Sequence, residues 1–213
     1  MTSAYNTSSK LAEYLLEIKA VKLQPKDPFK WSSGWNSPIY CDNRITLSYP
    51  EIRNFIKKEM ASAILKQFPG TTALCGVATA GIAIGGLVAD ELNMPYAYCR
   101  PKPKEHGMKN QLEGRLDKSE KIIVIEDLIS TGGSSLKVVD FLRNNSYNVV
   151  GMVSIFTYWF DEAANNFVKA NCALHSLGNY NDMVEQAKEQ GIVQESDLPV
   201  LAEWRKDPAN WNA

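Results

Sequence analysis

The amino-acid sequence predicts a single α/β domain in which helices flank a mostly parallel central sheet. Segments with helical and strand-like patterns alternate along the chain, which is typical of parallel strands joined by crossover helices. One strand-like segment, Ile122 to Ile125, is apolar at every position, as expected for a buried strand. The chain has 213 residues, of which 45% are hydrophobic and 22% charged, so we expect residues 1–213 to form one domain with its own core.

The two N-terminal helices are predicted from apolar residues at helical spacing. The first follows Ser9. The second starts at the capping-box pattern Ser48-x-x-Glu51, has Pro50 in its first turn and runs to about Phe68. Their apolar stripes comprise Leu11, Tyr14, Leu15 and Ile18 in the first helix, and Ile52, Phe55, Ile56, Met60, Ala63 and Ile64 in the second.

The rest of the chain continues the alternation of helix and strand. His175 lies in the last predicted strand, in the apolar pattern ALHSL, and is expected to be a core residue with satisfied hydrogen bonds. We expect strands near 72–76, 95–99, 121–126, 149–156 and 172–177, and helices near 80–92, 133–144, 180–189 and 197–206.

Charge and cysteine content exclude several classes of protein. The formal net charge of -1 argues against a general nucleic-acid binder and against a membrane-surface binder. No apolar run follows a basic start and none reaches about 18 residues, so we expect no secretory signal, no membrane span and a cytoplasmic location. No C-x-x-C pattern occurs, so the cysteines are expected to be free and mostly buried; they are Cys41, Cys75, Cys99 and Cys172.

The segment IIVIEDLISTGGSS, at residues 122–135, combines a buried strand, two carboxylates and a glycine-rich turn into a helix. Gly132 and Gly133 allow positive φ, so that backbone N–H groups can converge on one point. The hydroxyl groups of Thr131, Ser134 and Ser135 are expected to add donors there. This end of the strand is therefore predicted to bind a phosphate.

Glu126 and Asp127 have the wrong charge for a phosphate, so we expect them to accept hydrogen bonds from sugar hydroxyls or to hold a metal through water. A structural Gly-Gly turn is the alternative interpretation. It does not explain two carboxylates directly after four buried aliphatic residues, where unused charge is costly. The nucleotide P-loop and the dinucleotide G-x-G-x-x-G pattern are both absent, so the segment predicts a site for a phosphorylated sugar.

This segment resembles the 5-phosphoribosyl 1-diphosphate (PRPP) binding motif of the type I phosphoribosyltransferases. Three further stretches are similar to the orotate phosphoribosyltransferases within that family: FKWSSGWNSPIYCDNR at 29–44, GVATAGIAIGG at 76–86 and RPKPKEHGMKNQLEG at 100–114. All four occur in the family's order. The resemblance implies the type I phosphoribosyltransferase fold, with a small hood contributed mainly by about residues 1–45 and a long mobile loop.

The segment between the strands expected to end near Cys99 and to begin near Lys121 is long and weakly periodic. It is locally basic, although a run of charge is often only a solvated face. Beside a phosphosugar site, a mobile lid that closes over pyrophosphate is the better interpretation. Its basic residues include Arg100, Lys102, Lys104, Lys109 and Arg115.

By resemblance, Arg100, Lys104 and His106 contact the pyrophosphate, and Lys102 is also available. His106 lies in a polar loop and could donate a proton or a hydrogen bond near neutral pH. Lys104, His106 and Asp127 are the candidate catalytic residues. The predicted PRPP site comprises Arg100, Lys102, Lys104, His106, Glu126, Asp127, Leu128, Ile129, Ser130, Thr131, Gly132, Gly133 and Ser134.

Mg²⁺ is the expected cofactor, because displacement of pyrophosphate builds negative charge on the leaving group. Mg²⁺ commonly binds through substrate phosphates, so we expect substrate and water to hold it, with no dedicated metal site in the protein. The resemblance also implies a homodimer in which the loop at 100–115 reaches into the neighbouring site.

Two stretches leave alternatives open. The small residues of GVATAGIAIGG either let backbone amides approach the pyrophosphate or allow close helix packing, and Ala80 stands where the family often has a lysine. The stretch at 29–44 predicts a rigid turn and a short strand, with Tyr40 on an aromatic or apolar face that can cover a flat base. The resemblance implies that backbone amides of this stretch, together with Ser130, contact orotate. Ser32 and Tyr158 stand at or near positions where some members carry a lysine and an arginine. A purely structural hood of packed aromatic side chains is the alternative, formed by Trp31, Trp35 and Tyr40.

Two functions from different classes follow from this resemblance. The first is an enzyme that makes orotidine 5′-monophosphate and pyrophosphate from orotate and PRPP, in pyrimidine synthesis. The second is a regulatory protein that senses PRPP without turnover. Lys104, His106 and the intact acidic pair favour the enzyme, since a sensor has no need for a lid over a leaving group. A transferase for a purine or another base is the alternative within the enzyme class.

Overall fold

The computed structural model describes residues 6–31, 33–101 and 111–211. Its centre is a six-stranded sheet with the order β10-β9-β8-β5-β6-β7, in which all neighbours are parallel except β6 and β7. The predicted α/β domain with a mostly parallel sheet is therefore confirmed. The strands are β5 (Ala73–Val77), β6 (Tyr96–Cys99), β7 (Leu112–Glu113), β8 (Lys121–Ile129), β9 (Asn148–Thr157) and β10 (Leu174–Asn179).

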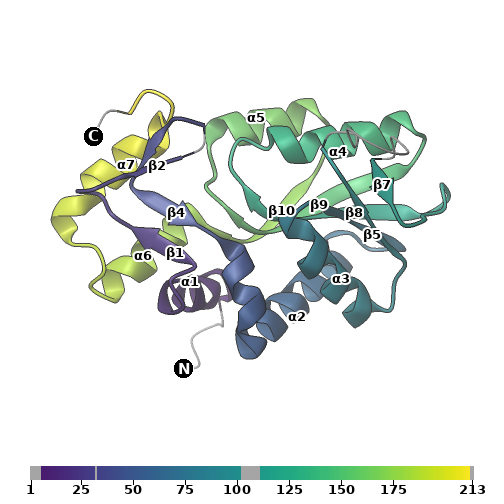
Figure 1. The fold of residues 1–213 in the computed structure, drawn as a ribbon, viewed down its shortest axis with the longest axis horizontal. Helices are drawn as coiled ribbons and strands as arrows, with labels where there is room; N and C mark the ends of the chain where they lie inside the picture. Colours follow the sequence, from purple (N-terminus) through teal and green to yellow (C-terminus); the bar gives the residue numbers. More distant parts are fainter. Residues whose placement is uncertain (1–5, 32, 102–110, 212–213) are drawn as a thin grey trace.

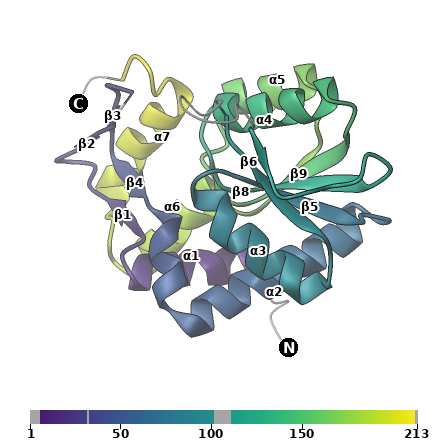
Figure 2. The ribbon, with the colours of Figure 1, turned by 45° about the vertical axis from the view of Figure 1, so that its right-hand side comes forward.

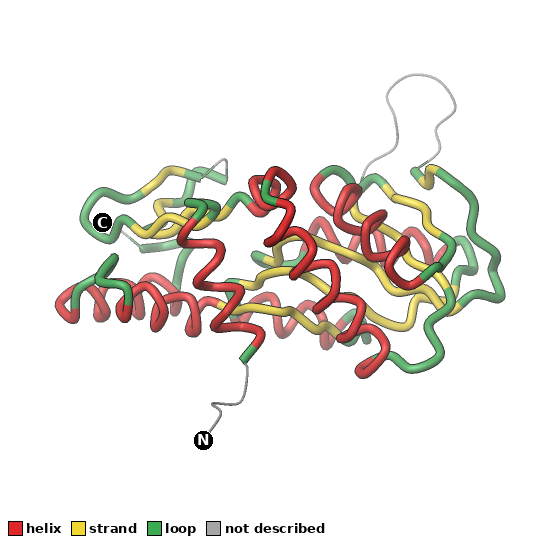
Figure 3. Tube along the Cα trace, turned by 90° about the horizontal axis from the view of Figure 1, so that it is seen from below, coloured by secondary structure: helices red, strands yellow, loops and turns green. Residues whose placement is uncertain are grey.

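Helices cover both faces of this sheet, as Figure 1 shows. One face carries α1 (Thr7–Glu17), α2 (Pro50–Gln67) and α3 (Ala80–Leu92), and the other carries α4 (Gly133–Asn144) and α5 (Asp161–Lys169). Seen from below in Figure 3, a layer of helices crosses in front of the strands. No helix in the described ranges is long and apolar enough to cross a membrane.

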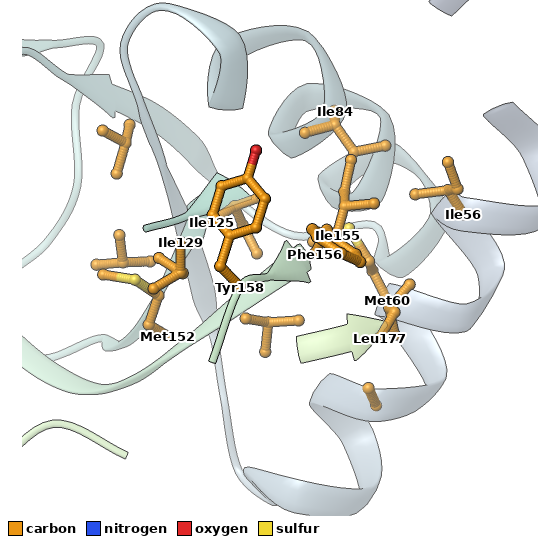
Figure 4. Packing of buried hydrophobic residues seen from close by; sticks show 14 of the residues in the cluster. Ile56, Met60, Ile84, Ile125, Ile129, Met152, Ile155, Phe156, Tyr158 and Leu177 are labelled. Carbon is orange, nitrogen blue, oxygen red and sulfur yellow. The ribbon is translucent and has the colours of Figure 1, made fainter. Parts of the chain in front are cut away.

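The main core lies between the sheet and the face that carries α2 and α3. Figure 4 shows Met60 of α2, Ile84 of α3 and Phe156 of β9 among the side chains that fill it, and all three are buried. Apolar periodicity predicted α2 within one residue of its end, because its buried positions recur at helical spacing. Burial of these side chains is the main free-energy gain that holds the helices on the sheet.

Four short strands form a hood beside the main sheet, next to the C-terminal helix α7 (Leu198–Lys206) (Figure 2). The sequence predicted only a rigid turn and one short strand here, since pairs of two- or three-residue strands are too short to show a period. The hood strands are β1 (Val21–Leu23) paired with β4 (Ile39–Cys41), and β2 (Phe29–Lys30) paired with β3 (Asn36–Ser37), both antiparallel.

Trp204 of α7 joins the C-terminal segment to the hood. Its side chain is fully buried, and its Nε1 donates a hydrogen bond to the carbonyl oxygen of Asn36 at 3.1 Å. The last part of the chain therefore contributes to both the sheet and the hood. The edge strand β10 is followed by α6 (Tyr180–Glu189), and α7 then packs against the hood. Ring centroids lie 5.3–5.8 Å from that of Trp204 in Trp31, Tyr158, Phe160 and Tyr180.

Two local predictions are wrong, and one helix was not predicted. The capping box at Ser48 does not form, because the 3-10 helix η1 (Asn43–Ser48) runs up to α2 and the extended N-cap position falls on Tyr49, which makes no side-chain cap hydrogen bond. Helix α5 was not predicted, because only Ala163 and Phe167 on it are buried. His175 is half-buried rather than in the core, because β10 is an edge strand with a neighbour on one side only.

The strand order contains a switch point. From β5 the chain moves outward through α3 to β6, and it then returns to place β8 on the other side of β5. Connections leave the carboxyl ends of β5 and β8 toward opposite sides, which opens a crevice at this edge of the sheet, where ligands bind in parallel α/β folds.

We predict that Trp204→Ala lowers the free energy of unfolding by about 3–5 kcal/mol, because it removes a fully buried indole and leaves a cavity among aromatic rings. Denaturant unfolding followed by circular dichroism measures this. Val168→Ala is the control, because that side chain is 78% exposed and its loss should change stability by about 0.5 kcal/mol or less. Equal effects of the two substitutions would contradict the role given to Trp204.

Candidate functional site

The acidic pair lies inside β8, not after it. β5 pairs with β8 only as far as Ile125, opposite Gly76, whereas β9 continues to pair with β8 up to Ile129. The sequence predicted a strand end near 126, because the carboxylates interrupt the apolar run, but pairing with β9 extends the strand. Asp127 thus lies at the switch point, where β8 has lost one of its two neighbours.

Glu126 is a buried carboxylate bonded within the chain. Its side chain is 6% exposed; Ser135 Oγ donates to Oε2 at 2.6 Å, and the backbone N–H of Asp127 donates to Oε1 at 3.1 Å. Burial raises the pKa of Glu126 well above its usual range, and the negative charge of Asp127 raises it further. Both oxygens are therefore occupied by donors of this chain.

Ser135 does not lie around the predicted phosphate site. It is buried in the first turn of α4, on the side that faces the sheet, where its hydroxyl binds Glu126. The prediction that it adds a donor for the phosphate is wrong. Helical geometry is the reason, since the start of α4 turns Ser134 toward solvent and the next residue inward.

Asp127 is tied to the hood through Asn43. The Nδ2 group of Asn43 donates a hydrogen bond to the backbone carbonyl of Asp127 at 2.8 Å, and its Oδ1 accepts one from Cys41 Sγ at 3.4 Å. The Asn43 side-chain amide thus hydrogen-bonds the backbone of β8 at a position where β5 no longer pairs with it. Sequence analysis missed this residue: it lies in the hood motif, but its partner is 84 positions away.

The predicted phosphate cradle is the N-terminus of α4. Gly132 adopts φ +79° as the N-cap, and no side chain caps the helix, so the first-turn N–H groups remain available to a ligand. Gly133 and Ser134 are exposed there, and the first turn carries no acidic residue. Positive φ was predicted for both glycines and is found only at Gly132, because Gly133 is already the first helical residue.

Helix α5 fixes the shape of this turn. A Cβ atom on Gly132 would lie 2.6 Å from Cε2 of Phe167, so a larger residue does not fit without movement of the ring. Asn166 of the same helix donates a hydrogen bond from Nδ2 to the carbonyl oxygen of Thr131 at 3.0 Å. The glycine is required both by its backbone conformation and by the packing above it.

An open cavity of about 710 Å³ lies between the hood and the loop after β8. It brings together Tyr40 and Ser130, the two residues predicted to bind a base. Trp31 lies 5.0 Å from the ring of Tyr158, centroid to centroid, so its indole packs within the hood as well as lining the cavity. The lining comprises Lys30, Trp31, Ser33, Trp35, Tyr40, Cys41, Leu128, Ser130, Thr131, Tyr158 and Glu162.

The remaining predicted PRPP residues fall into three groups. Ile129 is buried in β8, whereas Leu128 and Thr131 are half-buried at the cavity. Arg100 follows β6, and its Nε lies 3.8 Å from Oε1 of Glu113 on β7. Lys102, Lys104 and His106 lie outside the described residues, as does Ser32, and their roles stay predictions.

The small residues of GVATAGIAIGG pack α3 closely against the sheet. A Cβ on Gly81 would lie 2.6 Å from the carbonyl oxygen of Ile125, and one on Gly85 would lie 2.8 Å from the ring of Tyr96. Of the two interpretations left open by the sequence, helix packing accounts for these two glycines. Ala80 is the first residue of α3.

Within the described part of the chain, no group of three or more His, Cys, Asp and Glu side chains could hold a metal ion. All four cysteines are free, and three of them are buried as predicted: Cys75, Cys99 and Cys172. The residues with side-chain oxygens at this edge are Asp127, Ser130 and Thr131, and all three are half-buried.

The chain matches the phosphoribosyl transferase domain family over residues 48–193. Orotate phosphoribosyltransferase of Phocaeicola vulgatus is 53% identical over 202 residues, covering 95% of both chains. The enzyme of the same name from Cytophaga hutchinsonii is 50% identical over 206 residues, covering 97% of this chain and 99% of the relative.

A solved structure agrees with this assignment. Orotate phosphoribosyltransferase from Aeropyrum pernix superimposes with a TM-score of 0.75 and 26% identity, covering 86% of this chain and 99% of the other. The similarity therefore extends over most of the chain. The chain belongs to the phosphoribosyltransferase family, and within it to the orotate phosphoribosyltransferases.

Proposed function

We propose that the chain transfers the 5-phosphoribosyl group of PRPP to orotate and releases orotidine 5′-monophosphate and diphosphate, a step of pyrimidine biosynthesis. One observation carries the proposal. The glycine-rich turn before α4, the Asp127 carboxylate and the aromatic cavity under the hood meet at a single edge of the sheet. They fit a phosphate, a sugar and a flat base in that order.

The geometry suggests how PRPP would lie. The 5′-phosphate would accept hydrogen bonds from the N–H groups of Gly133 and Ser134 at the start of α4. The ribose hydroxyls would face Asp127, whose carboxylate is the more exposed of the acidic pair. Glu126, with both oxygens bonded, would contribute mainly by fixing the Asp127 backbone N–H.

The leaving diphosphate requires positive charge in a site without competing water, because cleavage at C1 builds positive charge on the ribose and negative charge on the diphosphate. Lys104 and His106, with Arg100 and Lys102, are the side chains assigned to it. Mg²⁺ fits the oxygen-only donors at this edge, and when bound to the diphosphate it would neutralise part of that charge. Asp127 would reach such an ion through water.

We further propose a homodimer in which the loop at 100–115 of one subunit completes the site of the other, as the resemblance implies.

A cytoplasmic location is also proposed. It is supported by four free thiols, since reduced cysteines are typical of proteins in a reducing compartment.

The reaction is tested by mixing the protein with PRPP, Mg²⁺ and one base at a time. We expect loss of the ultraviolet absorbance of orotate and no turnover of a purine. Chelation of Mg²⁺ should abolish the change. Turnover of a purine but not of orotate would show a different base specificity, and PRPP binding without turnover of any base would show a sensor.

Asp127→Asn is expected to weaken PRPP binding by about 10-fold or more, because it replaces a charged acceptor of ribose hydroxyl hydrogen bonds, each worth about 1.5 kcal/mol. Titration calorimetry with PRPP measures this change. Asp140→Asn, which alters an exposed carboxylate farther along α4, should bind PRPP like the unmodified protein. Unchanged affinity in Asp127→Asn would remove Asp127 from the ribose site.

Lys104→Ala is expected to lower kcat by about 100-fold with little change in orotate binding, because the charge that Lys104 meets develops as diphosphate leaves. Steady-state kinetics measures both parameters, with Lys66→Ala on the exposed end of α2 as the control.

Mixing Lys104→Ala subunits with Asp127→Asn subunits should restore part of the activity if the loop acts on the partner's site. No recovery would contradict that arrangement.

A further inference from the structure

We propose that Lys30 binds the carboxylate of orotate and thereby selects a carboxylated pyrimidine over one without the carboxylate. The inference rests on the proposed function and names a specificity-determining residue of that same site. Lys30 is the last residue of hood strand β2 and lines the cavity that also contains Tyr40 and Ser130.

The first argument for this role comes from the charged side chains that line the cavity. Among the described residues that line it, only Lys30 and Glu162 are charged, and the rest are aromatic, aliphatic, hydroxyl or thiol side chains. A carboxylate that leaves water for such surroundings loses solvation and needs a cation or several hydrogen-bond donors in return. Glu162 has the same sign as the ligand, so Lys30 is the partner that the described lining offers.

The backbone of Lys30 is held firmly. Its Cα is paired with that of Asn36 across the β2–β3 ribbon, and the neighbouring Trp31 bonds the ribbon through its backbone N–H to the Trp35 carbonyl at 2.9 Å. Trp204 Nε1 bonds the Asn36 carbonyl from the other side. Because the ribbon already holds the backbone of Lys30, ligand binding needs to order only its side chain.

The side chain of Lys30 is exposed, and within the described ranges it takes part in no ion pair. Its ammonium group is therefore available. The nearby Arg44 is not, because its Nε and Nη2 bind the two carboxylate oxygens of Asp42 at 2.6 and 2.8 Å. Tyr158, which also lines the cavity, brings no positive charge to the base.

Orotidine 5′-monophosphate and uridine 5′-monophosphate form the test, because they differ only in the carboxylate. Their dissociation constants are measured by calorimetry for the unmodified protein and for Lys30→Gln, Lys30→Arg and the control Lys22→Gln. Lys22 is an exposed hood lysine on β1 that does not line the cavity. The ratio of the two constants isolates the carboxylate contact, as in a double-mutant cycle.

We expect the unmodified protein to prefer orotidine 5′-monophosphate by at least about 10-fold, as for a charge-assisted contact. Lys30→Gln should remove most of this preference without changing the affinity for uridine 5′-monophosphate. The unchanged affinity would also show that the site of the variant is folded. Lys30→Arg should retain the preference, and Lys22→Gln should behave like the unmodified protein.

A preference that survives in Lys30→Gln would overturn the proposal and assign the carboxylate to other donors. Equal weakening of both nucleotides would overturn it as well, since that result indicates a structural role for Lys30. Orotate turnover by the unmodified protein, measured separately, distinguishes these outcomes from failure of the proposed function.

Discussion

The unequal lengths of β5 and β8 determine the arrangement of the site. β8 continues beside β9 for four residues after its last pairing with β5, so the backbone around Asp127 has a strand on one side and none on the other. Backbone groups at such a position need partners. Asn43 supplies one to the Asp127 carbonyl and Glu126 supplies one to its N–H, while Ser135 holds the Glu126 carboxylate. The backbone geometry at the switch point is thus fixed by hydrogen bonds from the Asn43, Glu126 and Ser135 side chains.

The hood depends on the same region and on the end of the chain. Asn43 connects it to β8, and Trp204 of α7 fills the centre of its aromatic cluster and bonds the β2–β3 ribbon. Two-stranded sheets made of two- and three-residue strands bury too little surface to be stable alone. These two connections help to hold the hood over the cavity, so Trp204 near the end of the chain supports a cavity whose described lining ends at Glu162.

The two halves of the site have different physical origins. The phosphate cradle follows from general features of α/β proteins: a parallel strand, a tight glycine turn and an uncapped helix N-terminus. The cavity under the hood depends on which side chains the hood presents, and Lys30 and Glu162 are the charged residues of its described lining. The turn before α4 can thus stay constant while the cavity changes with a few residues of the hood.

Local pattern in the sequence was enough to predict the parallel α/β sheet, the buried strand that carries the acidic pair, the glycine turn into a helix and the family. Tertiary structure alone decided which groups face the ligand. Ser135 turns inward to Glu126, His175 lies on an edge strand, and Asn43 finds its partner 84 residues away. Hydrophobic periodicity predicts which residues of one helix or strand are buried. The orientation of a polar side chain depends instead on which backbone and side-chain groups of the neighbouring elements still need a hydrogen-bond partner.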